Sequence, residues 1–86
     1  MTSAPAGTVS VQVRFFALLR ERAGCEARRV ELPAGSTVGD LLERLARDMP
    51  DLPTGVAAAV DRAYASRDRA LRGGEEVALI PPVSGG

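Results

Sequence analysis

The sequence predicts an α+β domain in which one main amphipathic helix packs on one face of a mixed, four- to five-stranded sheet. Three observations lead to this expectation. The chain has 86 residues, a length suited to one small domain. Apolar and polar residues alternate near both ends of the chain, as they do in half-buried strands. Between these stretches, one segment repeats its apolar residues at the spacing of an α-helix.

The first expected strand covers residues 8–16. Four apolar side chains alternate along one face of it: Val9, Val11, Val13 and Phe15. Phe16 breaks the alternation, because it places a large apolar side chain on the polar face. Residues 17–23 are rich in helix formers and end at Gly24, which predicts one or two helical turns after the strand.

The main helix is expected after a second strand at residues 26–32. Ser36 or Thr37 can cap its N-terminus, and Asp40 follows Thr37 at the spacing of a capping box. Met49-Pro50 ends the helix. One apolar stripe runs along it and is expected to pack in the core: Val38, Leu41, Leu42, Leu45, Ala46 and Met49.

The remaining segments complete the sheet. Residues 56–60 are interpreted as a strand that leads into a turn, and Tyr64-Ala65 as a short strand. The charged connector at residues 67–72 is expected to form one turn of tight helix. The last strand covers residues 75–80. Val77 and Leu79 lie on one face of this strand, so Ala78 and Ile80 lie on the other.

This order of elements predicts the β-grasp, or ubiquitin-like, arrangement. If the helix forms a right-handed crossover, the first and last strands can lie side by side in parallel at the centre. The expected organisation is a disordered leader at residues 1–7, a β-grasp domain at residues 8–80 and an extended tail at residues 81–86.

Composition narrows the classes of function. Eleven basic residues balance 11 acidic ones, all the basic residues are arginines, and the chain has no His. Without histidine, most acid–base and metal-ion mechanisms are disfavoured, so no metal site is expected. A balanced charge with only three aromatic residues argues against nucleic-acid binding. No apolar run is long enough to cross a membrane, and the single Cys25 fits a reducing cytoplasm. We therefore expect a cytoplasmic protein whose Cys25 has no catalytic role.

The final residues, Pro81-Pro82-Val83-Ser84-Gly85-Gly86, are the most informative for function. Two glycines make a tip narrow enough to enter a partner's cavity, and two prolines keep the base of the tail extended. The reactive group would be the carboxylate of Gly86, with the five preceding residues positioning it. A carboxylate is a poor electrophile, so acyl chemistry requires activation, for instance by ATP. The chain has no phosphate-binding loop or general base, so the activating enzyme would be another protein.

A surface for such a partner is predicted beside the tail. Phe16 and Ile80 are expected on the outward face of neighbouring strands, and Tyr64 is assigned to the same partner-binding set. The alternatives are that these are ordinary isolated surface residues, or that the short helix after Phe16 covers them.

Two blocks of the sequence stand out together. The first reads Phe15-Phe16-Ala17-x-Leu19-Arg20-Glu21-x-x-Gly24. The second reads Leu71-x-x-Gly74-Glu75-Glu76-Val77-Ala78 and runs into the Pro-Pro-Val-Ser-Gly-Gly ending. Across residues 8–86 the chain thereby resembles the MoaD/ThiS family of sulfur carriers, in particular the small subunits of molybdopterin synthase. The chain departs from that family's usual residues at Leu79-Ile80, Asp61 and Gly73, none of which belongs to the tip.

The resemblance implies a complete cycle of sulfur transfer. An E1-like adenylyltransferase would use ATP to adenylate Gly86, and a sulfurtransferase would supply sulfur for a thiocarboxylate. The tail would then enter the large synthase subunit and donate sulfur to cyclic pyranopterin monophosphate, in molybdenum cofactor biosynthesis. The small subunit would bind no cofactor and supply no catalytic side chain. Two small subunits are expected on a dimer of large subunits.

Three alternatives remain at this point. The chain could carry sulfur for thiazole or cysteine synthesis, with the same tip and chemistry. It could be a ubiquitin-like protein modifier, although the absence of Lys forbids self-linked chains. It could also be a passive interaction module whose Gly-Gly has no function.

Overall fold

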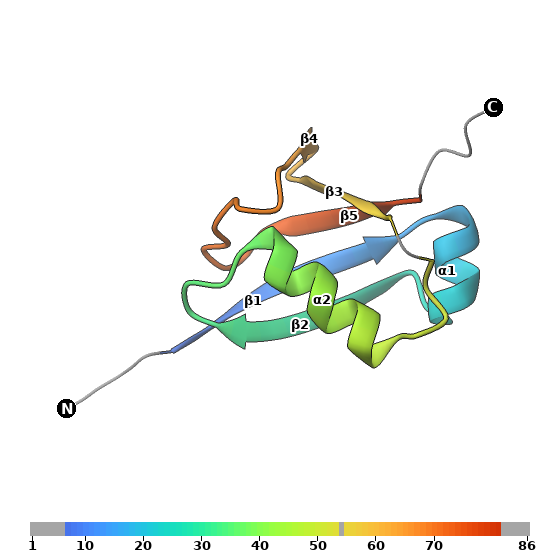
Figure 1. Cartoon of the computed structure of the whole chain (residues 1–86), viewed down its shortest axis with the longest axis horizontal. Coiled ribbons are helices and arrows are strands. Elements are labelled where there is room, and N and C mark those ends of the chain that lie inside the picture. The colour runs from blue at the N-terminus through green and yellow to red at the C-terminus, as the bar shows by residue number, and fades with distance from the viewer. Residues whose placement is uncertain (1–6, 54, 82–86) are drawn as a thin grey trace.

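The computed structural model describes residues 7–53 and 55–81. Figure 1 shows a single sheet crossed by one long helix, with a shorter helix at one end. The elements in chain order are β1 (Thr8–Phe15), α1 (Ala17–Ala23), β2 (Ala27–Pro33), α2 (Val38–Asp48), β3 (Ala57–Val60), β4 (Ala63–Tyr64) and β5 (Glu76–Ile80). Neither helix in these ranges is long and apolar enough to span a bilayer.

The sheet confirms the predicted β-grasp topology. Its strand order is β2-β1-β5-β3-β4, so the first and last strands lie side by side at the centre. β1 and β5 are parallel, and the other neighbouring pairs are antiparallel. The register places Phe15 opposite Leu79 and Ala57 opposite Ile80. These pairs determine which side chains share a face at the end of β5 where the tail begins.

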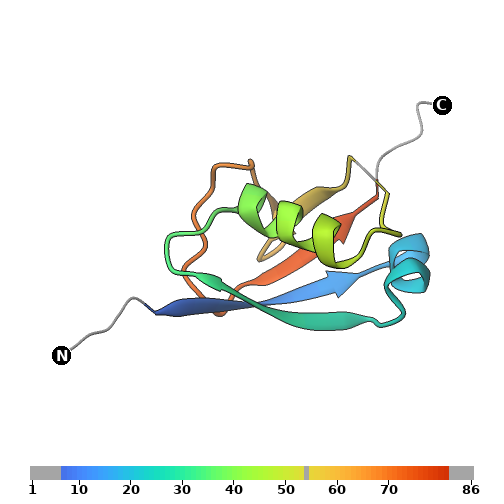
Figure 2. The same cartoon turned by 60° about the horizontal axis from the view of Figure 1, so that its bottom comes forward.

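The core lies between the sheet and α2. Figure 2 shows α2 over one face of the sheet, and no helix of the described residues covers the other face. The residues expected to point inward are buried there, including Val13 and Phe15 of β1 and Val77 and Leu79 of β5. From α2, Val38, Leu41 and Leu45 meet them, as the apolar stripe predicts. Ala46 differs from the prediction: it is exposed, because it lies at the edge of the stripe farthest from the sheet.

The N-terminus of α2 begins at the predicted capping box. The Thr37 hydroxyl accepts a hydrogen bond from the Asp40 N–H at 3.2 Å, and the Thr37 N–H donates to the Asp40 carboxylate at 2.9 Å. Ser36 is not the cap; its hydroxyl donates to the Pro33 carbonyl at 2.7 Å. The two N–H groups that follow, those of Val38 and Gly39, find partners outside the helix.

Those partners lie in the connector at residues 67–72, where the predicted helical turn is wrong. Val38 donates to the Arg69 carbonyl at 2.9 Å, and Gly39 donates to the Arg67 carbonyl at 2.7 Å. Ala70 also forms an isolated antiparallel bridge with Thr37. The connector is a strap across the start of α2, because its carbonyls satisfy the helix's unpaired N–H groups. A Cβ atom at Gly39 would lie 3.2 Å from the Arg67 carbonyl oxygen, which explains glycine there.

A charged side chain holds the turn before β5. The carboxylate of Glu75 accepts hydrogen bonds from the N–H groups of Arg72, at 2.8 Å, and Gly73, at 2.7 Å. Gly73 and Gly74 both have positive φ angles, so the turn bends sharply around this carboxylate. Burial alone would raise the pKa of Glu75, but the two backbone donors favour the charged form and bring the pKa below its ordinary value.

We predict that Glu75→Gln destabilises the domain at neutral pH by about 1–2 kcal/mol, because a charged acceptor of two hydrogen bonds is lost. A carboxyl whose pKa is lowered by folding stabilises the fold above its unfolded pKa of about 4.3. That stabilisation is lost as the pH falls through the folded pKa. Urea denaturation at a series of pH values should therefore show the difference between wild type and variant shrinking below about pH 4.

Glu21→Gln, on the exposed side of α1, is the matched control and should change the free energy of unfolding little at any pH. A wild-type advantage over Glu75→Gln that stays constant as the solution becomes acidic would contradict this role for the charged carboxylate.

The other predicted elements are confirmed with small shifts of their bounds. α1 ends where Gly24, with a φ of 79°, closes the helix in the left-handed conformation. Cys25 is a free, half-buried thiol that packs against the core. The backbone pairing reaches back to Gly7, whose carbonyl accepts a hydrogen bond from Ala34.

Candidate functional site

The predicted tail leaves the domain at the end of β5. Ile80, the last residue of this strand, and Pro81, the first after it, are both half-buried. The predicted reactive Gly86 and the predicted positioning residues Pro82, Val83, Ser84 and Gly85 lie outside the described residues. The described structure therefore shows where the tail begins and what surrounds its base.

Phe16 lies at this same end of the sheet. It is the N-cap residue of α1, and its extended backbone (φ −119°, ψ 150°) continues the alternation of β1. Because Phe15 points into the core, Phe16 points to the opposite face, and it is 51% exposed. The Phe16 carbonyl also accepts hydrogen bonds from Leu19 and Arg20, which hold the start of α1. α1 therefore does not cover Phe16.

The strand register places the other predicted residues on the same face. Since Phe15 lies opposite Leu79, the residues that follow them, Phe16 and Ile80, both turn to the outward face. Ile80 lies opposite Ala57 of β3. Tyr64 of β4 lies opposite Ala59, two residues along the same strand, so it shares that face and is 77% exposed.

The structure thus brings together the predicted partner-binding residues across four adjacent strands. The outward residues between Phe16 and Tyr64 are Ile80 and alanines of β3 and β5, so the surface is an apolar area close to the base of the tail. We call it the apolar sheet end; it consists of Phe16, Ala57, Tyr64, Ala78 and Ile80.

The other half of this open face is polar. Arg14 and Glu76 form an ion pair at 3.2 Å between β1 and β5. Farther along, the Arg29 side chain donates to the Ser10 hydroxyl at 2.6 Å. The open face is therefore divided, with its apolar part nearest to Pro81.

The described residues near the tail suit docking more than catalysis. Across residues 7–53 and 55–81, no group of three or more His, Cys, Asp or Glu side chains is arranged to hold a metal ion. The apolar sheet end itself contains no carboxylate, thiol or amine. Its side chains can exclude water and position a neighbouring protein, but they cannot activate a carboxylate.

One exposed apolar residue was not predicted. Leu18 of α1 is 45% exposed, whereas the adjacent Leu19 is completely buried. The sequence carried no signal for this, because adjacent positions of a helix, such as Leu41 and Leu42, can both contact the core. Leu18 is thus another exposed apolar side chain, on the helix that begins after Phe16.

Comparison with known proteins places these features in a family context. The model of the ThiS family matches residues 13–86. The molybdopterin synthase sulfur carrier subunit of Drosophila ananassae is 36% identical, over 98% of this chain and 99% of its own length. The small archaeal modifier protein 1 of Haloferax volcanii is also 36% identical, over 85% of this chain and 97% of its own.

Solved structures share the fold. A chain described as a molybdopterin converting factor subunit 1 from Pyrococcus furiosus superposes with a TM-score of 0.78 at 34% identity, covering 87% of this chain and 99% of its own. A chain from the complex of subunits 1 and 2 of the molybdopterin-converting factor of Helicobacter pylori gives a TM-score of 0.63 at 24% identity. It covers 91% of this chain and 100% of its own, and this likeness concerns the fold.

Proposed function

We propose, on the premise that this chain belongs to the ThiS family, that it is the sulfur carrier subunit of a molybdopterin synthase. The observation that carries the proposal is the match to such subunits along nearly the whole of both chains. The family match also extends through the Gly-Gly ending to Gly86. The geometry supports the proposal, because β5 ends, and the predicted tail begins, beside the apolar sheet end.

The chemistry takes place at the carboxylate of Gly86. One oxygen of this carboxylate attacks the α-phosphorus of ATP on an E1-like adenylyltransferase, which gives an acyl-adenylate and releases pyrophosphate. Hydrosulfide released by a sulfurtransferase then attacks the acyl carbon and displaces AMP, so the carrier becomes a thiocarboxylate. The carrier's side chains take no part in these bond changes, consistent with the lack of His and Lys in the chain.

The large synthase subunit is the proposed recipient. Supporting this pairing, a chain of the same fold occurs in a complex of subunits 1 and 2 of the molybdopterin-converting factor. The apolar sheet end docks on that subunit, and the tail enters its active site, where sulfur passes to cyclic pyranopterin monophosphate. An extended tail of six residues reaches roughly 19 Å, at about 3.1 Å per residue.

Reconstitution tests this function directly. The thiocarboxylated chain, mixed with a large synthase subunit and cyclic pyranopterin monophosphate, should yield the dithiolene product and return as the carboxylate. Intact-mass measurement of the carrier before and after the reaction follows the loss of sulfur. Thiocarboxylated carrier that yields no dithiolene with a competent large subunit would reject the assignment to molybdopterin synthesis.

Protein modification is a second candidate, favoured by the similarity to small archaeal modifier protein 1. The same activated Gly86 would then be attacked by a lysine amine of another protein. In cells of the native host, such conjugates would be larger species that resist hydroxylamine, because an isopeptide bond survives a reagent that cleaves a thioester. Their absence during active sulfur transfer would exclude this second role.

A further inference from the structure

A polar pocket lies at the opposite end of β5 from the tail. It has a volume of about 420 Å³, is open to solvent, and is lined by the side chains of Asp61, Arg69, Arg72 and Glu75. Glu75 precedes β5 and Pro81 follows it, so a five-residue strand, about 17 Å long, separates the pocket from the base of the tail. The pocket is therefore distinct from the apolar sheet end.

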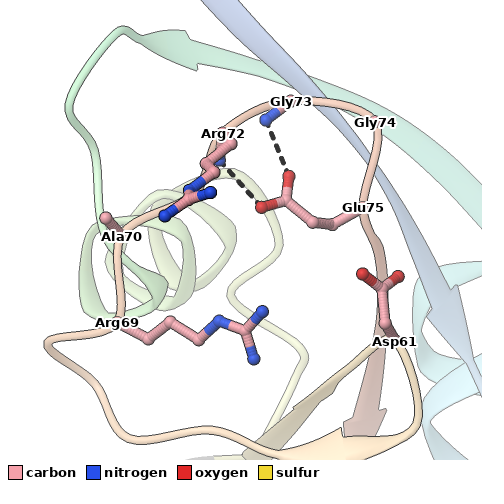
Figure 3. A pocket seen from close by; sticks show the side chains of 7 residues that line it. All are labelled: Asp61, Arg69, Ala70, Arg72, Gly73, Gly74 and Glu75. Carbon is pink, nitrogen blue, oxygen red and sulfur yellow. Dashed lines mark hydrogen bonds between the residues drawn. The ribbon is translucent and has the colours of Figure 1, made fainter.

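Two arginine side chains extend into this pocket. Figure 3 shows the side chains of Arg69 and Arg72 both directed into the hollow, across from the carboxylates of Asp61 and Glu75. No hydrogen bond or ion pair joins either guanidinium to another lining residue within the described chain. Other arginines are paired with carboxylates: Arg14, Arg28, Arg29, Arg44 and Arg67.

The backbone on both sides of the pocket is held in place. The Arg69 carbonyl accepts the Val38 N–H at the start of α2, and the Arg72 N–H donates to the Glu75 carboxylate. Leu71, between them, donates to the Ser36 carbonyl at 2.9 Å. The two arginines therefore extend from fixed positions, which lowers the entropy lost when their guanidinium groups bind a ligand.

The charges around the pocket indicate the ligand. Two guanidinium groups favour an anion, and a planar guanidinium binds a carboxylate through two parallel hydrogen bonds. Asp61 and Glu75 balance the charge of the two arginines, so a peptide, which also brings backbone hydrogen-bond donors, suits the pocket better than phosphate. The Asp61 carboxylate, which accepts the Glu76 N–H at 3.1 Å, keeps capacity to accept a further hydrogen bond from a backbone N–H.

We propose that this pocket binds an acidic segment of a partner protein, with one carboxylate held by Arg69 and Arg72. A pocket open to solvent suits a surface segment better than a small molecule, which usually needs a site that buries most of its surface. Because the pocket is remote from Pro81, a partner bound there leaves the tail free. The proposal is independent of sulfur transfer, since it concerns the unmodified chain.

The test is a titration of the full-length, ¹⁵N-labelled chain followed by NMR at low ionic strength. The probe is an acetylated, amidated hexaglutamate peptide, and inorganic phosphate is titrated separately. The peptide should produce saturable shifts at the amides of Arg69, Arg72, Gly73 and Gly74. In R69Q/R72Q the apparent dissociation constant should rise about tenfold or more, since two charge-assisted interactions are lost.

Arg47→Gln is the matched control, because Arg47 is exposed on α2 and lies outside the pocket. It removes one of the two positive charges that R69Q/R72Q removes, and it should change the affinity less than about twofold. If the double variant loses its native amide spectrum, R72Q alone replaces it. Three results would overturn the proposal: shifts that do not saturate, equal weakening in Arg47→Gln, or tighter binding of phosphate than of the peptide.

Discussion

Deletion of Gly86 is expected to abolish sulfur transfer while the domain stays folded. The deletion moves the terminal carboxylate back by one extended residue, about 3.1 Å. A displacement of only 1 Å at a reacting centre can reduce the rate about 100-fold, so the loss here should be at least that large. The measurement is dithiolene formation with the large subunit, and a melting curve on the same samples reports the fold.

Two further variants sharpen this test. Appending one residue after Gly86 should be as damaging as the deletion, because it also misplaces the carboxylate. Deleting residues 2–6 should leave the rate unchanged, since it alters chain length without altering the tip. An appended residue that remains attached and leaves the rate intact would show that the terminal carboxylate is not the reacting group.

Phe16→Arg is expected to weaken binding of the large subunit by about 2 kcal/mol, or roughly 30-fold. The variant places a charge at the apolar sheet end, where a partner would have to desolvate it. The effect on folding should be small, because half of the Phe16 side chain is already exposed. Ile80→Asp should weaken binding in the same way. Isothermal titration gives the affinity, and urea denaturation gives the free energy of unfolding.

Leu18→Arg provides the comparison for Phe16→Arg, because it makes the same substitution at a residue of similar exposure on α1. If docking is confined to the apolar sheet end, Leu18→Arg should retain most of the affinity. Equal losses in both variants would extend the docking surface to α1. Normal binding by Phe16→Arg, or its failure to fold, would remove Phe16 from the docking surface.

The main elements of the fold could be predicted because local signals were strong. Alternation in residues 8–16 gave both the inward face of β1 and the exposure of Phe16. The spacing of Thr37 and Asp40 indicated the start of α2, and of the two predicted caps, Ser36 and Thr37, the structure has Thr37. The connector at residues 67–72 was wrongly predicted as helix, because its conformation depends on hydrogen bonds to Val38 and Gly39, far away in the sequence.

Part of the candidate site could likewise be predicted from local sequence, and part of it could not. The Gly-Gly tip and the outward position of Ile80 follow from adjacent residues and the period of a strand. The pocket formed by Arg69 and Arg72 could not be predicted, because it exists only after the strap has packed across α2 and Glu75 has closed the turn. The exposure of Leu18 could not be predicted either, because adjacent helix positions such as Leu41 and Leu42 can both contact the core.

The pairing of β1 with β5 has a consequence for synthesis of the protein on the ribosome. β1 is the first strand to emerge, yet its central neighbour is the last strand made. Until β5 emerges, Val13 and Phe15 lack the partners Val77 and Leu79 beside them. A prematurely terminated chain therefore cannot complete its hydrophobic core, and it exposes apolar surface of the kind that chaperones and proteases recognise. Only a molecule translated through β5 can present a folded docking face.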